Sequence, residues 1–156
     1  MDYKTNVMRM LDQKKIPYKS YSYADTDAIS GTEVAEVLGQ NPAQVFKTLV
    51  TVSKANQYYV FVIPVEKELD LKRAAASVGE KSVRMLPAKE LLSLTGYVHG
   101  GCSPIGMKKV FRTVVHETAS EHETIIFSAG KIGYQVELSL EDLNKILPHK
   151  VTSLTE

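Results

Sequence analysis

Two neighbouring segments rich in β-branched and aromatic residues constrain the fold of this 156-residue chain most strongly. Residues 45–53 and 57–65 are separated only by Lys54, Ala55 and Asn56. Segments of this composition with so short a connection are typical of two antiparallel strands joined by a turn. Because apolar residues occupy alternate positions on both sides of the first segment, we expect both of its faces to be buried.

Helices and further short strands surround this hairpin in the sequence. Apolar residues at helical spacing predict a helix over residues 3–14, and Ser30 with Glu33 forms a capping box for a second helix that runs to Leu38. Asp70 is expected to cap a helix over 71–78, and turn signals predict further helices over 88–94 and from Ser139 to before Pro148. Alternation predicts further strands over 82–86, 111–116, 124–128 and 135–138. About six or seven strands interleaved with helices predict a mixed α/β (α+β) fold, with a curled mixed sheet or partly open barrel flanked by helices.

Size, charge and cysteine content limit the class of protein. A chain of 156 residues without internal repeats fits one domain over residues 1–156. Its 19 Lys and Arg residues nearly balance 18 Asp and Glu residues, so nucleic acid is not attracted without a local patch. The one cysteine, Cys102, forms no intrachain disulfide, no signal peptide is recognisable, and the longest apolar run, residues 58–65, is far short of the ~20 residues that span a bilayer. We therefore expect a cytoplasmic protein with no membrane partner.

Lys47 is the first candidate for chemistry, because it is a cation in a strand whose two faces are both predicted to be buried. Such a charge needs either a partner or a pocket. One interpretation is that its aliphatic stem lies on apolar surface while the ammonium reaches water. The other is that Lys47 points into a cleft, where it would bind a phosphate or a carbonyl oxygen.

The turn-rich segment of residues 100–106 is the second candidate. Gly100 and Gly101 let backbone N–H groups approach a ligand closely, and Pro104 stiffens the far side of the segment. This pattern suits a developing oxyanion or a carboxylate, although a tight turn between strands has the same composition.

Covalent catalysis by a protein nucleophile and metal chemistry are both disfavoured by the pattern. Cys102 or Ser103 would need a base, and the candidates, His99 and His116, have no spacing that guarantees contact. An unpaired cysteine is more often a small buried apolar residue. The two His-Glu dipeptides that begin at His116 and His122 do not have the His-Glu-x-x-His spacing of a zinc site, and they predict a solvated turn. We expect neither a metal nor another cofactor.

Three further groups have a structural and a functional interpretation. Tyr21 and Tyr23 are expected on one face of a strand, either as core aromatics or with a hydroxyl in a cleft. Asp142 follows Ser139 at the spacing of a helix cap. The glycine-containing residues 128–133 form either a plain loop or a second wall of the same cleft.

Taken together, these segments resemble the YbaK/EbsC-type aminoacyl-tRNA deacylases, relatives of the insertion editing domain of bacterial prolyl-tRNA synthetases. The matching stretches are residues 15–18 (KIPY), 45–49 (VFKTL), 96–106 (GYVHGGCSPIG) and 128–131 (SAGK), with the acidic residues 141–142 at a helix start. They occur in the family's order and cover essentially the whole chain. The glycine segment combined with the lysine strand is far more specific than either alone.

The resemblance implies hydrolytic clearance of wrong amino acids from tRNA by a mixed α/β domain. A proline site built on apolar shape cannot strongly reject cysteine or alanine, because a methylene-sized difference gives only about 1 to 3 kcal/mol. In the cysteine-specific branch, the substrate's own thiol is thought to attack its ester, which releases a cyclic thioester and needs no protein nucleophile.

Site residues follow from the same resemblance. Lys47 matches the family's active-site lysine, Tyr23 its tyrosine and Asp142 its acidic residue, so these three are the expected catalytic residues. Lys47 would hold the terminal nucleotide or the aminoacyl carbonyl. The residues expected to bind the substrate are Gly100, Gly101, Ser103, Pro104, Ser128 and Gly130.

The expected function is removal of cysteine from Cys-tRNA(Pro), with the 3′ end of a mischarged tRNA and prolyl-tRNA synthetase as partners; the oligomeric state stays open. Cys102 stands where the family motif often has an aliphatic residue, which could shift the amino acid accepted. The alternatives are a deacylase for another mischarged tRNA such as Ala-tRNA(Pro), a non-catalytic module that binds a tRNA end, and an unrelated small-molecule esterase.

Overall fold

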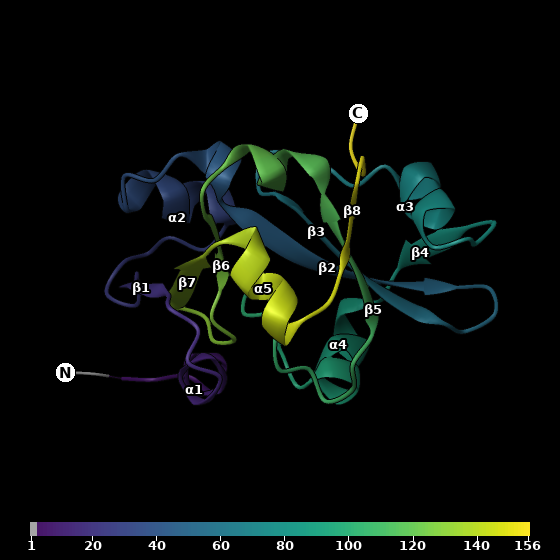
Figure 1. Cartoon of the computed structure of the whole chain (residues 1–156). Coiled ribbons are helices and arrows are strands. Elements are labelled where there is room, and N and C mark those ends of the chain that lie inside the picture. The colour runs from purple at the N-terminus through teal and green to yellow at the C-terminus, as the bar shows by residue number, and fades with distance from the viewer. Residues whose placement is uncertain (1–2) are drawn as a thin grey trace.

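The computed structural model describes residues 3–156, which form two β-sheets with helices around them (Figure 1). The predicted hairpin is confirmed as two long antiparallel strands. The elements in chain order are α1 (Asn6–Gln13), β1 (Lys19–Ser22), α2 (Gly31–Val37), the 3-10 helix η1 (Pro42–Gln44), β2 (Phe46–Ser53), β3 (Tyr58–Pro64), α3 (Leu71–Ser77), β4 (Val83–Met85), α4 (Ala88–Thr95), β5 (Arg112–His116), the 3-10 helix η2 (Glu117–Glu121), β6 (Ile125–Ser128), β7 (Tyr134–Leu138), α5 (Leu140–Ile146) and β8 (Lys150–Thr152).

Strand pairing confirms the mixed α/β class and corrects its details. The larger sheet has the order β4-β2-β3-β5-β8, with β3, β5 and β8 parallel and the other pairs antiparallel. The smaller sheet has the order β1-β7-β6. One isolated bridge, between Val45 and Ile126, joins their edges, so the predicted curled sheet does not close into a barrel. Over residues 3–156 there are eight strands instead of six or seven, because the three-residue β8 has too short a pattern to detect.

Both faces of the larger sheet are buried, as alternation along the hairpin predicts. Val60 and Val62 point into a main core shared with both sheets and with α1, α4 and α5. Phe61 and Ile63 point into a second core under α3, which lies beside β4 in Figure 1. Successive strand side chains point to opposite faces, so one strand contributes to both cores.

Local capping signals place two of the helices as predicted. Ser30 accepts from the backbone N–H of Glu33, and the Glu33 carboxylate accepts from the backbone N–H of Ser30, which completes the capping box of α2. Asp70 caps α3 by accepting from the backbone N–H groups of Lys72 and Arg73. No helix within the described residues is long and apolar enough to cross a bilayer.

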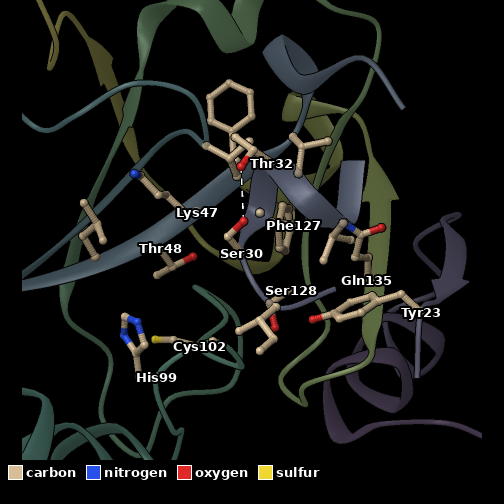
Figure 2. Close-up of a pocket in the computed structure, with 18 of the residues that line it drawn as sticks. Tyr23, Ser30, Thr32, Lys47, Thr48, His99, Cys102, Phe127, Ser128 and Gln135 are labelled. Atoms are coloured by element: carbon tan, nitrogen blue, oxygen red, sulfur yellow. Dashed lines mark hydrogen bonds between the residues drawn. The ribbon is translucent and has the colours of Figure 1, made fainter. Parts of the chain in front are cut away.

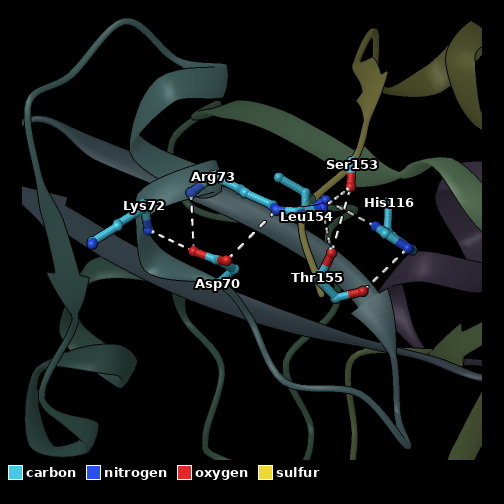
Figure 3. Close-up of polar contacts among 7 residues, drawn as sticks. All are labelled: Asp70, Lys72, Arg73, His116, Ser153, Leu154 and Thr155. Carbon is cyan, nitrogen blue, oxygen red and sulfur yellow. Dashed lines mark hydrogen bonds and ion pairs between the residues drawn. The ribbon is translucent and has the colours of Figure 1, made fainter.

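The end of the chain after β8 is held by hydrogen bonds to two distant elements (Figure 3). The backbone N–H of Asp70 donates to the carbonyl oxygen of Leu154 at 2.8 Å, and the Arg73 guanidinium donates to the carbonyl oxygen of Thr155 at 2.8 Å. On the other side, Nδ1 of His116 accepts from the backbone N–H of Leu154 at 2.9 Å. Nε2 of His116 lies 3.3 Å from Oγ1 of Thr155.

His116 corrects the prediction of a solvated turn. It ends β5 and only 4% of its surface is exposed. Burial disfavours the charged imidazolium and therefore lowers the pKa of His116 below its ordinary value of 6.5.

Candidate active site

A pocket with a volume of about 350 Å³ opens where the two sheets separate (Figure 2). Its walls come from the loop between β1 and α2, from β2, from the loop after α4, and from β6 and β7. The lining residues are Tyr23, Ile29, Ser30, Gly31, Thr32, Val34, Val45, Phe46, Lys47, Thr48, Leu49, Val65, Leu91, His99, Gly100, Cys102, Phe127, Ser128 and Gln135. None of these described residues is Asp or Glu.

The pocket follows from the pairing of β2. The carbonyl oxygen of Val45 accepts from Val65 across the hairpin, so backbone groups at odd positions of β2 point to β3. Groups at the even positions, including Phe46 and Thr48, point to the other edge. On that edge β4 pairs with β2 from Thr51 onward, and the backbone N–H of Leu86 donates to the carbonyl oxygen of Val50. The bridge between Val45 and Ile126 lies just before β2. The first half of β2 therefore presents a free strand edge to the pocket.

Lys47 lines the pocket beside this strand edge. No residue between 3 and 156 forms a hydrogen bond or an ion pair with the Lys47 ammonium. The ammonium is therefore available to a bound ligand. The neighbouring Thr48 also lines the pocket, and its hydroxyl is shielded from solvent without a hydrogen-bond partner. An unsatisfied buried hydroxyl costs free energy unless a ligand or water pairs with it. This part of β2 therefore offers a cation, a hydroxyl and backbone groups.

The two tyrosines separate instead of sharing one strand face. β1 ends at Ser22, and Tyr23 lies beyond it, where its backbone N–H donates to the carbonyl oxygen of Gly133 at 2.8 Å. Its ring is buried and lines the pocket. Tyr21 instead donates its hydroxyl to the carboxylate of Glu137, outside the pocket. Tyr23 is therefore the tyrosine available to a ligand.

The glycine segment contributes only part of its length to the pocket. Gly100, with a φ of 89°, lines it. Gly101 backs against the chain near Ile132, where a Cβ atom would lie 3.0 Å from the Ile132 backbone nitrogen. Ser103 is fully buried, and its hydroxyl accepts from the backbone N–H of Ile105. Pro104 does not line this pocket but a separate, mostly apolar cavity.

Of the other predicted site residues, Ser128 lines the pocket, whereas Gly130 and Asp142 do not. Ser128 lines the pocket and its hydroxyl accepts from the backbone N–H of Gly130, while Gly130 itself packs against Tyr97. Asp142 lies outside the pocket in the first turn of α5. Its carboxylate forms an ion pair with Lys145 at 2.8 Å, which lowers the pKa of that carboxyl.

Cys102 and His99 both line the pocket, but the thiol is not activated. Burial raises the pKa of the Cys102 thiol to about 12, so it stays protonated near neutral pH. A protonated thiol is a poor nucleophile.

Gln135, on β7, is a polar pocket residue that no sequence motif singles out. Only 4% of its surface is exposed, and Nε2 of Gln40 donates to its Oε1 at 2.8 Å. The sequence signal for Gln135 was a polar residue at the start of the strand predicted over residues 135–138. That signal is weak, because most strand ends carry polar residues.

Comparisons with known proteins add a family and relatives to this geometry. A family model of the aminoacyl-tRNA editing domain matches residues 26–146. EbsC of Enterococcus faecalis, described as a candidate Cys-tRNA(Pro)/Cys-tRNA(Cys) deacylase, is 48% identical over 153 residues, which is 97% of this chain and 93% of that protein. A proline–tRNA ligase of Shouchella clausii is 31% identical over 111 residues, which is 71% of this chain and 19% of the ligase.

Solved structures share the fold. A hypothetical protein superimposes with a TM-score of 0.88 at 24% identity and covers 97% of this chain and 100% of its own. A candidate trans-editing enzyme for prolyl tRNA synthetase superimposes with a TM-score of 0.83 at 22% identity over 99% of both chains. At this identity the likeness concerns the fold alone.

Proposed function

Because the chain belongs to the aminoacyl-tRNA editing domain family, we propose that it is a trans-editing deacylase that removes cysteine from Cys-tRNA(Pro). The relative that shares 48% of its residues is described by the same activity, and by action on Cys-tRNA(Cys). The single observation that carries the proposal is that Lys47 and Gly100, 53 residues apart by their numbers, line one pocket with an unpaired ammonium and a free strand edge.

The charge of the pocket supports binding of the reacting ester. Lys47 and the backbone N–H of Thr48 are suited to the carbonyl oxygen, whose negative charge grows as the ester is attacked. The described lining contains no carboxylate that would oppose this charge. The same cation favours the thiolate form of a bound cysteine side chain over the thiol.

The proposed chemistry uses the nucleophile that the substrate brings. The cysteine sulfur attacks its own ester carbonyl carbon, a carbon–sulfur bond forms, and the carbon–oxygen bond to the terminal ribose breaks. The thiol proton ends on the released ribose hydroxyl, and the cyclic thioester is later opened by water. A protein nucleophile is unnecessary, which is compatible with the high pKa of about 12 for the Cys102 thiol.

The roles of the predicted residues differ within this proposal. Lys47 stabilises charge, while Tyr23, Ser128 and Gly100 bound the aminoacyl group. Asp142 lies in the ion pair with Lys145 and takes no part.

We also propose that the protein works in the cytoplasm, where charged tRNA is used, and that it meets its substrate with prolyl-tRNA synthetase. The net charge of +1 supports this second point, because a nearly neutral protein gains little affinity from the phosphate backbone of tRNA.

A deacylation panel tests the function. Purified protein is incubated with Cys-tRNA(Pro), Cys-tRNA(Cys), Ala-tRNA(Pro) and Pro-tRNA(Pro), and loss of each ester is followed against a reaction without enzyme. We expect the two cysteinyl esters to be cleaved and prolyl ester to persist. Lys47→Met should lower the rate by roughly 100-fold or more, as for loss of one oxyanion donor. Lys54→Met, in the exposed β2–β3 turn, is the matched control and should be unchanged.

Other outcomes identify the alternatives. Cleavage of Ala-tRNA(Pro) alone would assign another editing substrate. Binding without turnover would make the protein a tRNA-end binding module, and a full rate in Lys47→Met would remove the lysine from the mechanism.

A further inference from the structure

Two glutamine side chains from different elements meet at the wall of the pocket. Gln40 follows α2, where Gly39 adopts a φ of 67° and the backbone N–H of Gln40 donates to the carbonyl oxygen of Ala35 at 2.8 Å. Gln135 lies in β7 and pairs with Ser128 of β6, so both of these side chains face the pocket. Although Gln40 lies 95 residues from Gln135, its Nε2 donates to Oε1 of Gln135 at 2.8 Å.

This hydrogen bond fixes which end of the Gln135 amide faces the pocket. A carboxamide carries its acceptor oxygen and its donor nitrogen on two diverging branches. Because Gln40 holds the oxygen, the nitrogen takes the other branch. Figure 2 shows the nitrogen of Gln135 on the side of Phe127 and its oxygen on the opposite side. Within residues 3–156, Nε2 of Gln135 has no hydrogen-bond partner and is not sealed from solvent, so it is a donor open to the pocket.

On the basis of the proposed function, we propose that Gln135 donates a hydrogen bond to the sulfur of the substrate cysteine, and that Gln40 is the positioning residue that keeps this donor in place. Lys47 and Thr48 are on the β2 side of the pocket, opposite Gln135 in Figure 2, and suit the carbonyl oxygen. On the Gln135 side, the Phe127 ring offers an apolar surface for a small side chain. An N–H donor stabilises a thiolate more than a thiol, because a hydrogen bond to a charged acceptor is the stronger one.

The pairing also makes the wall selective. The Gln135 N–H can donate to a thiolate. Because the described lining residues include no carboxylate, this wall offers no negative partner to a cationic side chain. An apolar alanine side chain would leave the Gln135 N–H unpaired, and an unpaired donor lowers the affinity for the wrong substrate. The specificity of this wall therefore depends on the orientation of one amide, which a residue outside the substrate's reach controls.

A double-mutant cycle with Gln40→Met and Gln135→Met tests this arrangement. Single-turnover rates on Cys-tRNA(Pro) are measured with saturating enzyme from pH 6 to 9, after subtraction of uncatalysed hydrolysis. We expect each single variant to be about 10-fold slower at pH 7, with the midpoint of the pH profile raised by about one pH unit. The double variant should be no slower than Gln135→Met, because Gln40 acts only through Gln135. Gln57→Met, in the exposed turn after β2, is the matched control.

Each result decides the inference. Additive losses, or an unchanged pH midpoint in Gln40→Met, would overturn it while leaving the deacylase function intact. A wild-type protein without deacylase activity would overturn both. Should Gln40→Met fail to fold, the isosteric Gln40→Glu carries the same test. Its carboxylate can only accept, so Gln135 must turn its nitrogen away from the pocket, and the rate should fall at least as far.

Discussion

Acid should weaken the fold through His116, because protonation breaks its contact with the end of the chain. The neutral ring accepts from the backbone N–H of Leu154 through Nδ1. Once protonated, both ring nitrogens carry hydrogens, and the buried N–H of Leu154 loses its acceptor. Leaving one buried donor unpaired costs about 1 to 3 kcal/mol. We expect a loss of that size in the free energy of unfolding.

The direction follows from the lowered pKa of His116. In the folded protein the ring resists protonation, so as pH falls the unfolded chain binds the proton first, near the ordinary pKa of 6.5. Stability is therefore fully present above that pH and is lost as pH falls through it towards the lower folded pKa. One proton limits the slope to about 1.4 kcal/mol per pH unit. The charges of Glu117 and Glu121 oppose the lowering, while Lys67 and Arg73 add to it.

Urea unfolding followed by circular dichroism at pH 8, 7, 6 and 5 measures this effect. The matched variant is His116→Asn, whose side-chain oxygen can accept from Leu154 without titrating near neutral pH. The wild type should lose about 1 to 2 kcal/mol more than His116→Asn between pH 8 and pH 5, because one proton acts over the ~1.5 pH units below the ordinary pKa of 6.5. The same pH dependence in both proteins would refute the role assigned to His116.

Three further predictions concern the glycine segment, a helix cap and the buried thiol. Gly106→Ala should lower the free energy of unfolding in urea by about 3 kcal/mol. Gly106 has a φ of 81°, which strains an alanine, and a Cβ would lie 2.8 Å from the Tyr97 hydroxyl oxygen. The added atom would therefore break the hydrogen bond from Tyr97 to the carbonyl oxygen of Ile105. Gly79→Ala, with a φ of 74° and nothing within 4 Å of its Cβ, should cost only about 1 kcal/mol, and equal losses would contradict the steric argument. Asp70→Ala should lower the free energy of unfolding by about 1 kcal/mol, because it removes the side-chain cap of α3. Lys72→Ala should leave it unchanged, because Lys72 contributes its backbone N–H to this cap. The native Cys102 thiol, with a pKa of about 12, should react with iodoacetamide at pH 8 roughly three orders of magnitude more slowly than in urea; a fast native reaction would show an activated thiol.

Signals carried by a few adjacent residues predicted the local structure well. The hairpin follows from two β-rich segments and a short turn, and the α2 and α3 caps follow from Ser30 and Asp70. Each of these depends on contacts within about four residues, which a sequence displays directly.

Three features that depend on distant contacts were not predicted. His116 is buried because Leu154 and Thr155 return to it 38 and 39 residues later. The Gln40–Gln135 bond spans 95 residues. The division into two sheets was also not predicted, because nothing local shows that within residues 3–156 one isolated bridge, between Val45 and Ile126, joins them.

Some of the predicted site residues line the pocket, while their roles stay predictions. An isolated cation in an apolar strand and paired glycines brought out Lys47 and Gly100, which both line the pocket. Asp142 was expected at the site from the family resemblance, but its carboxylate pairs with Lys145 and does not line the pocket. Sequence spacing alone does not distinguish a helix cap from a catalytic acid.

The most direct test of the account compares Cys-tRNA(Pro) with the same tRNA charged with serine. The two esters differ by one atom, sulfur against oxygen, and at neutral pH a thiol ionises far more readily than a hydroxyl. If the substrate thiol is the nucleophile, single-turnover cleavage of the cysteinyl ester should be roughly 100-fold faster or more, with the difference growing as pH rises towards 8.5. Equal rates on both esters would contradict the account, because the attacking group would then come from the protein or from water.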